Sequence, residues 1–221
     1  MNALPSLVRR LGPVLAATAL ATPFAAPMNA IAGPSLLVNG SFEADVIANN
    51  TWQVQASWTG WQGEPTIELR HQNFGLAQDG LQFVELDTFG NSGMHQDVAT
   101  AAGEHYTLSW WYSPRPTVAA PSNPIEVYWN DQLLMTNGGS GVGIGAHQWQ
   151  LFTFDVIGTG GLDRVRFLAT GTSDSIGGSL DNVALVGAPA AVPEPAAPAL
   201  VLAALTALGF ASRNRRDRRD R

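Results

Sequence analysis

The feature that most constrains this chain is the short, alternating pattern of apolar and polar residues in its middle part. In residues 105–112 (HYTLSWWY), Tyr106, Leu108, Trp110 and Tyr112 share one face of an extended strand, because successive side chains point to opposite sides. Nine further segments are predicted as strands: 35–38, 66–70, 82–87, 94–98, 125–129, 132–135, 150–156, 163–169 and 179–186. Short strands separated by polar turns predict an all-β, antiparallel β-sandwich.

Composition excludes several kinds of chemistry. The chain of 221 residues contains no Cys and no Lys, so disulfides, thiol catalysis, thiolate metal sites and Schiff bases are excluded. Residues 33–192 contain 15 acidic residues and four Arg, a formal charge of −11. This charge argues against a nucleic-acid partner, because phosphate contacts need clustered basic side chains.

Residues 1–32 are typical of a secretory signal peptide. Arg9 and Arg10 precede a short apolar run at 11–21, and residues 30–32 (AIA) fit the small-x-small rule for cleavage. The alternative, a retained membrane helix, is disfavoured by three prolines and by the short apolar length. We therefore expect cleavage after Ala32 and export of the remaining chain.

Residues 189–221 form a tail of three parts. The motif Val192, Pro193, Glu194 and Pro195 is followed by an apolar stretch at 196–211 and an Arg-rich end at 212–221. Positive charge after an apolar segment holds that end in the cytoplasm. A helix over the apolar stretch would span about 24 Å, less than the ~30 Å hydrocarbon core. The tail therefore predicts a short apolar helix and transient membrane insertion.

This tail resembles the PEP-CTERM sorting signal of Gram-negative bacteria, in its VPEP motif, apolar stretch and terminal arginines. In that family the signal is recognised by exosortase, a membrane processing enzyme, in bacteria that produce exopolysaccharide. The resemblance implies removal of the tail near Pro195 and delivery of the protein to the outer cell surface or the extracellular matrix.

The predicted sandwich domain, residues 33–188, resembles the galactose-binding-like jelly rolls, which include many carbohydrate-binding modules. The matching segments are 38–43, 58–62, 79–80, 83–86, 103–108 and 180–183. The resemblance implies a jelly-roll fold and a structural Ca²⁺ between the first and last strands. Glu43 and Asp181 stand at the matching acidic positions, and carboxylates are ligands that Ca²⁺ prefers. The alternative is that both acids cap turns or face water.

Aromatic side chains on outward strand faces are candidate sugar contacts. By alternation, Trp111 and Tyr128 lie opposite the core-facing Trp110 and Trp129, and Glu126 shares the face of Tyr128. An aromatic ring can cover the C–H face of a pyranose while neighbouring polar groups bind its hydroxyls. Trp111, Tyr128 and Glu126 are thus the predicted ligand-binding residues. The alternative is that these rings pack under a loop or in a strand buried on both faces.

No catalytic residues are predicted. Glu85 and Asp87 share one strand face about 6.6 Å apart, but a glycosidase needs carboxylates on both sides of the scissile bond. A solvated or cation-binding face is expected there instead. The four His lack metal-ligand spacing.

The sequence thus predicts an exported, non-catalytic protein that binds glycan or is adhesive. One alternative is a structural matrix protein without a specific ligand, and a less favoured one is a secreted glycoside hydrolase or lyase.

Overall fold

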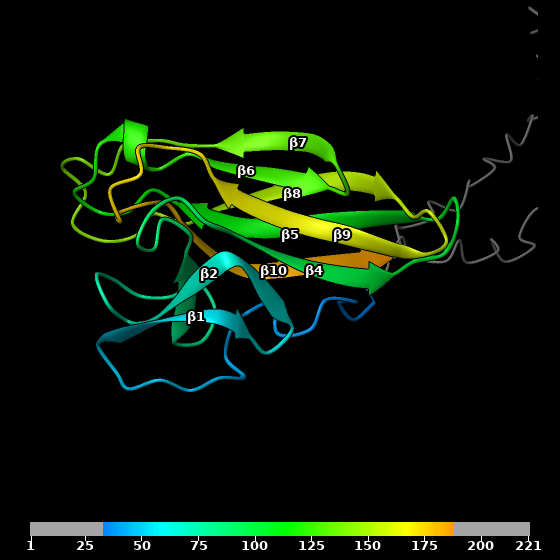
Figure 1. Cartoon of the computed structure of the whole chain (residues 1–221), viewed down its shortest axis with the longest axis horizontal. Coiled ribbons are helices and arrows are strands. Elements are labelled where there is room, and N and C mark those ends of the chain that lie inside the picture. The colour runs from blue at the N-terminus through cyan, green and yellow to red at the C-terminus, as the bar shows by residue number, and fades with distance from the viewer. Residues whose placement is uncertain (1–32, 188–221) are drawn as a thin grey trace, which may run out of the picture. The chain divides into compact units, whose positions relative to one another are not determined.

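The computed structural model describes residues 33–187, which form an all-β domain (Figure 1). Its ten strands are β1 (Thr51–Trp58), β2 (Trp61–His71), β3 (Gln82–Glu85), β4 (Gly93–Ala99), β5 (His105–Ser113), β6 (Ile125–Trp129), β7 (Gln132–Asn137), β8 (Gln150–Ile157), β9 (Leu162–Ala169) and β10 (Ser179–Gly187). Within this range the single helical segment is one 3₁₀ turn, η1 (Ala120–Ser122).

Antiparallel pairing joins all the strands into two layers. The order is β7-β6-β9-β4-β2-β3-β10-β5-β8, and β1 pairs with β2 outside this path. Strand β2 connects the layers, because residues 62–64 pair with β4 whereas residues 68–71 pair with β3. Strands β7, β6, β9 and β4 form one layer, and β3, β10, β5 and β8 form the other (Figure 1).

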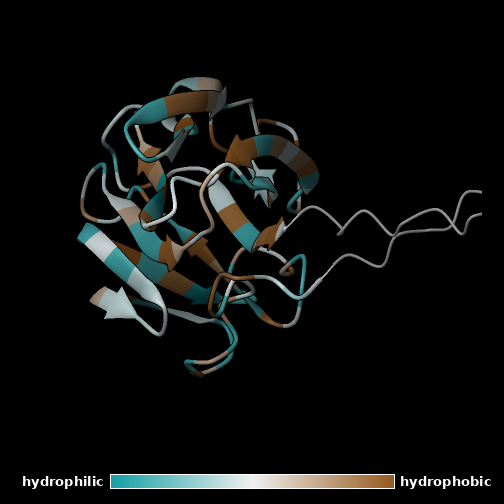
Figure 2. Ribbon diagram, turned by 90° about the vertical axis from the view of Figure 1, so that its right-hand side faces the viewer, coloured by the Kyte–Doolittle hydropathy of each residue, from teal (hydrophilic) through white to brown (hydrophobic). Residues whose placement is uncertain are grey.

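Large aromatic side chains fill the space between the layers. Trp110 of β5 meets Phe167 of β9 edge to face, with ring centroids 6.0 Å apart, and Phe167 lies 6.2 Å from Trp61 of β2. Along β5, β6 and β9 buried residues alternate with less buried ones. Figure 2 shows the matching bands of hydrophobic and hydrophilic residues along the strands. The predicted antiparallel sandwich is confirmed.

Two segments differ from the sequence-based expectation. Strand β1 was not among the predicted strands, although its sequence TWQVQASW places Trp52, Val54, Ala56 and Trp58 on one face; β1 pairs along β2 and most of its residues are exposed. The strand predicted at 35–38 is wrong, and bends lie there instead. Leu36 donates its N–H to Leu185 O, but the N–H of Leu37 is taken by Ser35 Oγ, which interrupts a ladder.

The two predicted end segments lie outside the described residues. These are the signal peptide at 1–32 and the sorting tail, with the apolar helix expected at 196–211. Between residues 33 and 187, no helix is long and apolar enough to cross a membrane.

Candidate functional site

A cavity of about 330 Å³ lies beside β2 and combines aromatic with charged side chains. Its lining residues come from strands and loops that are far apart in sequence: Trp52, Glu68, Arg70, Phe74, Thr88, Phe89, Arg115 and Ser175. Trp52 belongs to β1, Glu68 and Arg70 belong to β2, and the remaining residues lie in loops. The volume falls at the lower end of the range for small-molecule sites, about 300–1,000 Å³.

Three exposed aromatic rings contribute to the lining. Trp52 is 49% exposed, Phe74 is 59% exposed and Phe89 is 79% exposed. Phe74 has a positive φ of 64°, a backbone conformation that costs energy for a residue with a side chain. Its ring lies over two guanidinium groups, 4.8 Å from the Cζ of Arg115 and 5.5 Å from that of Arg70. Cation–π attraction therefore helps to hold Phe74 in this strained position.

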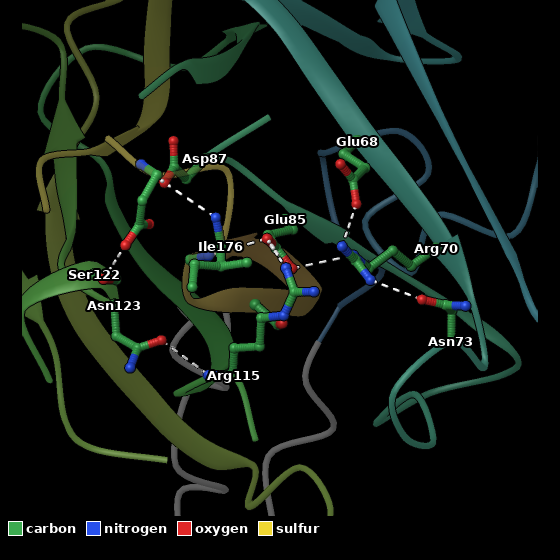
Figure 3. Close-up of polar contacts among 12 residues, drawn as sticks. Glu68, Arg70, Asn73, Glu85, Asp87, Arg115, Ser122, Asn123 and Ile176 are labelled. Atoms are coloured by element: carbon green, nitrogen blue, oxygen red, sulfur yellow. Dashed lines mark hydrogen bonds and ion pairs between the residues drawn. The ribbon is translucent and has the colours of Figure 1, made fainter. Parts of the chain in front are cut away.

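Charged groups behind these rings form a buried network (Figure 3). Glu68 and Glu85 stand directly opposite each other on β2 and β3, and like charges so placed repel. Arg70 bridges them, because its Nη2 lies 2.5 Å from Glu68 Oε1 and its Nε lies 3.0 Å from Glu85 Oε2. Arg115 Nη1 donates to Glu85 Oε1 at 2.6 Å. Two carboxylates are thus balanced by two guanidinium groups.

Each charged group in the network lies beside a group of opposite charge, but some of their atoms make no hydrogen bond. Glu68 Oε1, Arg70 Nε and Glu85 Oε2 are buried and make no well-directed hydrogen bond, although each faces an opposite charge. Burial raises the pKa of Glu85 to about 7, and it also raises the pKa of Glu68, despite the nearby guanidinium groups. Perturbed titratable groups beside a cavity are typical of functional sites.

The prediction of a solvated face at Glu85 and Asp87 is wrong. Glu85 is 1% exposed and Asp87 is 0% exposed, because β3 lies between β2 and β10 and is buried on both faces. Asp87 Oδ2 accepts the N–H groups of Asp174 at 3.0 Å and Ile176 at 3.2 Å (Figure 3). Glu85 Oε1 accepts the N–H of Gly177 at 2.9 Å. Both carboxylates therefore anchor the loop that precedes β10.

The predicted sugar-binding residues lie away from the cavity. On β6, the hydroxyl of Tyr128 donates to Glu126 Oε2 at 2.5 Å, and the guanidinium of Arg166 lies 5.5 Å from the Tyr128 ring centroid. Trp111 lies on β5, in the other layer, and alternates with the core residue Trp110. The structure thus brings Tyr128 and Glu126 together, but places Trp111 on an opposite face. Their role as glycan contacts stays a prediction.

The two predicted calcium ligands both contact the loop between β2 and β3. Glu43 Oε1 accepts the N–H groups of residues 81 and 82 at 2.8 and 2.6 Å. Asp181 Oδ2 accepts those of residues 78 and 79 at 2.7 and 2.9 Å. Burial raises the pKa of Asp181 to about 7. In the part of the chain that the structure describes, no three His, Asp or Glu side chains are placed to hold a metal ion. The calcium site stays a prediction beside the turn-capping alternative.

Sequence reasoning missed the cavity because no local motif contains it. Its lining spans residues 52 to 175, and its charges meet only through strand pairing. One signal was available in the sequence: Glu68 and Arg70 alternate onto one face of a predicted strand, and Glu85 is an acid within another. Such charges in two otherwise apolar segments indicate a buried ion pair.

The fold and the tail together define the class of this protein: an exported, all-β sandwich protein that is sorted to the cell surface. Residues 191–216 match the PEP-CTERM protein-sorting motif. The chain therefore carries a PEP-CTERM sorting signal, and the prediction made from Val192, Pro193, Glu194 and Pro195 is confirmed.

Similarity to known proteins extends over most of the chain. It is 29% identical over 162 residues to the multifunctional-autoprocessing repeats-in-toxin of Vibrio cholerae, a match that covers 70% of this chain. The chain spans about 3% of the length of the curated relatives it matches.

Comparison with solved structures finds a cyclase and a carbohydrate-binding module. A Stig cyclase from Fischerella sp. TAU, in complex with (3Z)-3-(1-methyl-2-pyrrolidinylidene)-3H-indole, aligns with a TM-score of 0.52 and 15% identity, over 72% of this chain and 99% of that one. A family 16 carbohydrate-binding module aligns with a TM-score of 0.44 and 17% identity, over 68% and 99%. At 15% identity, the likeness to the cyclase shows a shared fold.

Proposed function

We propose that this protein binds glycan at the cell surface through the cavity beside β2. The observation that carries the proposal is the combination of exposed aromatic rings with a polar, charged interior. The faces of Trp52 and Phe89 offer apolar area for the C–H side of a sugar ring. Glu68, Thr88 and Ser175 line the same cavity and supply hydrogen-bonding groups for hydroxyls.

The sorting signal supports this proposal, because we expect it to deliver the domain to the cell surface, where it would meet exopolysaccharide. We expect an exosortase-type enzyme to remove the tail near Pro195 and leave the domain outside the cell. Binding to exopolysaccharide through the cavity would then hold the protein in the extracellular matrix, which gives the domain an adhesive role.

The geometry of the carboxylates supports binding rather than hydrolysis. A glycosidase needs two carboxylates that reach the scissile bond from opposite sides. Glu68 lines the cavity, but Glu85 lies behind it and both of its oxygens face guanidinium groups. Asp87 is fully buried and holds a loop. We therefore propose a non-catalytic domain.

Two tryptophan variants distinguish the cavity from the predicted site on β5. We expect Trp52→Ala to weaken retardation in affinity electrophoresis about threefold to tenfold, because an aromatic contact contributes about 0.5–1.5 kcal/mol beyond its buried area. Trp111→Ala is the matched comparison: it should bind like the unmodified chain if the cavity is the site, and should lose binding if the predicted site on β5 is used. The experiment uses the full chain and a panel of neutral and acidic polysaccharides.

Two outcomes of this comparison would contradict the proposal. Loss of binding in Trp111→Ala but not in Trp52→Ala would move the site to the face of β5. No retardation by any polysaccharide in the panel would contradict glycan binding.

A further inference from the structure

Cations are scarce in this domain, and half of them lie at the cavity. Residues 33–192 contain four Arg against 15 acidic residues, and Arg70 and Arg115 both line the cavity. Arg164 and Arg166 lie on β9 and pair with Asp97 and Glu64. Burying two cations beside each other is costly, so their position calls for a reason beyond neutralising Glu68 and Glu85.

The two cavity arginines differ in how many of their guanidinium nitrogens contact an acceptor. Arg70 contacts Glu68 through Nη2, Glu85 through Nε and Asn73 through Nη1. Arg115 contacts Glu85 through Nη1, and within residues 33–187 its Nε and Nη2 contact no acceptor. Arg115 is only 8% exposed, but its Nε and Nη2 are not among the buried polar atoms that lack a partner, so these donors remain accessible at the cavity that Arg115 lines. A guanidinium group with free N–H donors at a cavity offers them to an acceptor on a bound ligand.

We propose that the sugar bound in the cavity is a uronate, with its carboxylate on the guanidinium group of Arg115. This inference rests on the proposed glycan-binding function and names the class of sugar. A carboxylate matches the fork of N–H donors on arginine, and such charge-assisted bonds are about twice as strong as neutral ones. A neutral hydroxyl would accept a single, weaker bond.

The surroundings of Arg115 favour an acidic sugar over other anions. Phe74 covers the guanidinium group from one side at 4.8 Å, and Trp52 and Phe89 add exposed ring area to the lining. A hexuronate has both an apolar C–H face for these rings and a carboxylate for the arginine. Inorganic phosphate has no apolar face and gains nothing from the rings. The raised pKa of Glu85, about 7, adds positive charge at the network in mildly acidic solution.

Matched pairs of sugars test this inference. Isothermal titration of the full chain compares glucuronate with glucose and galacturonate with galactose. We expect at least one uronate to bind about tenfold or more tightly than its neutral counterpart, because a hydrogen bond to a charged group contributes about 1.5–3 kcal/mol. Phosphate is included and should not compete.

Three variants locate the carboxylate. Arg115→Lys keeps the charge but loses the fork of donors, and should lower uronate affinity about tenfold and neutral-sugar affinity by much less. The double variant Arg115→Gln with Glu85→Gln removes the buried pair without leaving a lone charge, and should abolish the preference. Arg164→Lys, in the exposed pair with Asp97, is the control and should behave like the parent chain.

The results separate this inference from the proposed function. Equal affinity for uronates and neutral sugars, or equal losses for both in Arg115→Lys, would overturn the uronate assignment and leave glycan binding in place. Competition by phosphate would also overturn it. If polysaccharides are retarded but no single sugar binds, the assignment fails while the function stands. If neither binds, both fail.

Discussion

At the scale of single residues, burial decides the properties of the charged side chains more than their position in the chain does. Glu85 and Asp181 are both buried in strands, and burial raises the pKa of each to about 7, against ordinary values of 4.5 and 3.8. His147 is also buried, and its pKa is lowered to about 4. All three groups therefore favour their uncharged forms in the folded protein.

These shifts predict that the domain is more stable at pH 5 than at pH 8. For Glu85 and Asp181 the folded pKa is raised, so their contribution to stability is full below the unfolded pKa and is lost as the pH rises to about 7. His147 acts in the opposite direction between pH 6.5 and about 4, but it is one group against two. We expect the unfolding temperature to fall by a few degrees from pH 5 to pH 8.

Calorimetry of the full chain across this pH range checks the sign. Asp181→Asn should flatten the dependence, whereas Asp131→Asn, at the exposed turn between β6 and β7, should leave it unchanged. A higher unfolding temperature at pH 8 than at pH 5 would contradict the burial effect.

At the scale of elements, carboxylates rather than apolar contacts position the loop between β2 and β3. Glu43 accepts the N–H groups of residues 81 and 82, and Asp181 accepts those of residues 78 and 79. The segment before Glu43 is in turn tied to β10, because Val183 donates its N–H to Gly40 O at 2.8 Å. The first and last parts of the domain thus meet around this loop.

A substitution at Gly80 tests whether the hydrogen bonds of Glu43 hold the loop between β2 and β3. Its φ is +65°, and an added Cβ would lie 2.5 Å from the Glu43 carboxyl group. Gly103 has a similar φ of +76° with open space around it, so Gly103→Ala has the same kind of backbone strain without the clash. We expect Gly80→Ala to lower the free energy of unfolding by about 1–3 kcal/mol more than Gly103→Ala does, because the Glu43 hydrogen bonds are lost.

Urea unfolding of both variants measures this difference, and equal losses would show that Glu43 does not hold the loop. Repeating the measurement with Ca²⁺ and with chelator tests the calcium prediction. A gain in stability with Ca²⁺ that Glu43→Ala removes would support a metal site at Glu43.

At the scale of the whole molecule, an all-β sandwich domain and a sorting tail share one chain. The tail acts through a linear motif, so we expect replacement of Pro193, Glu194 and Pro195 by Ala to stop its processing. The altered protein should keep its tail and accumulate in the membrane fraction. Pro189→Ala, just before the motif, is the control and should be sorted normally.

Mass spectrometry of membrane, matrix and medium fractions identifies the ends of the protein in each. Normal processing and release of the triple variant would show that the motif does not direct sorting.

Most of the fold was predictable because strand alternation is a local property. Residues 105–112 place Trp110 in the core and Trp111 outside simply because successive side chains point to opposite faces. Strand β1 was not predicted although its apolar residues Trp52, Val54, Ala56 and Trp58 alternate, and most of its residues stay exposed where it pairs with β2. The candidate site was not predictable in the same way. Alternation places Glu85 on one face of a predicted strand, but it does not show whether that face is buried or exposed to solvent.

The sequence by itself determined most of the strands, their inward faces and the sorting tail, because each depends on residues close together in the chain. Tertiary structure alone decided the cavity. Pairing of β2 with β3 sets Glu68 against Glu85, and a loop from β5 brings Arg115 to them. Enclosure of β3 between two strands then removes water from these charges, and no local pattern specifies which strands become neighbours.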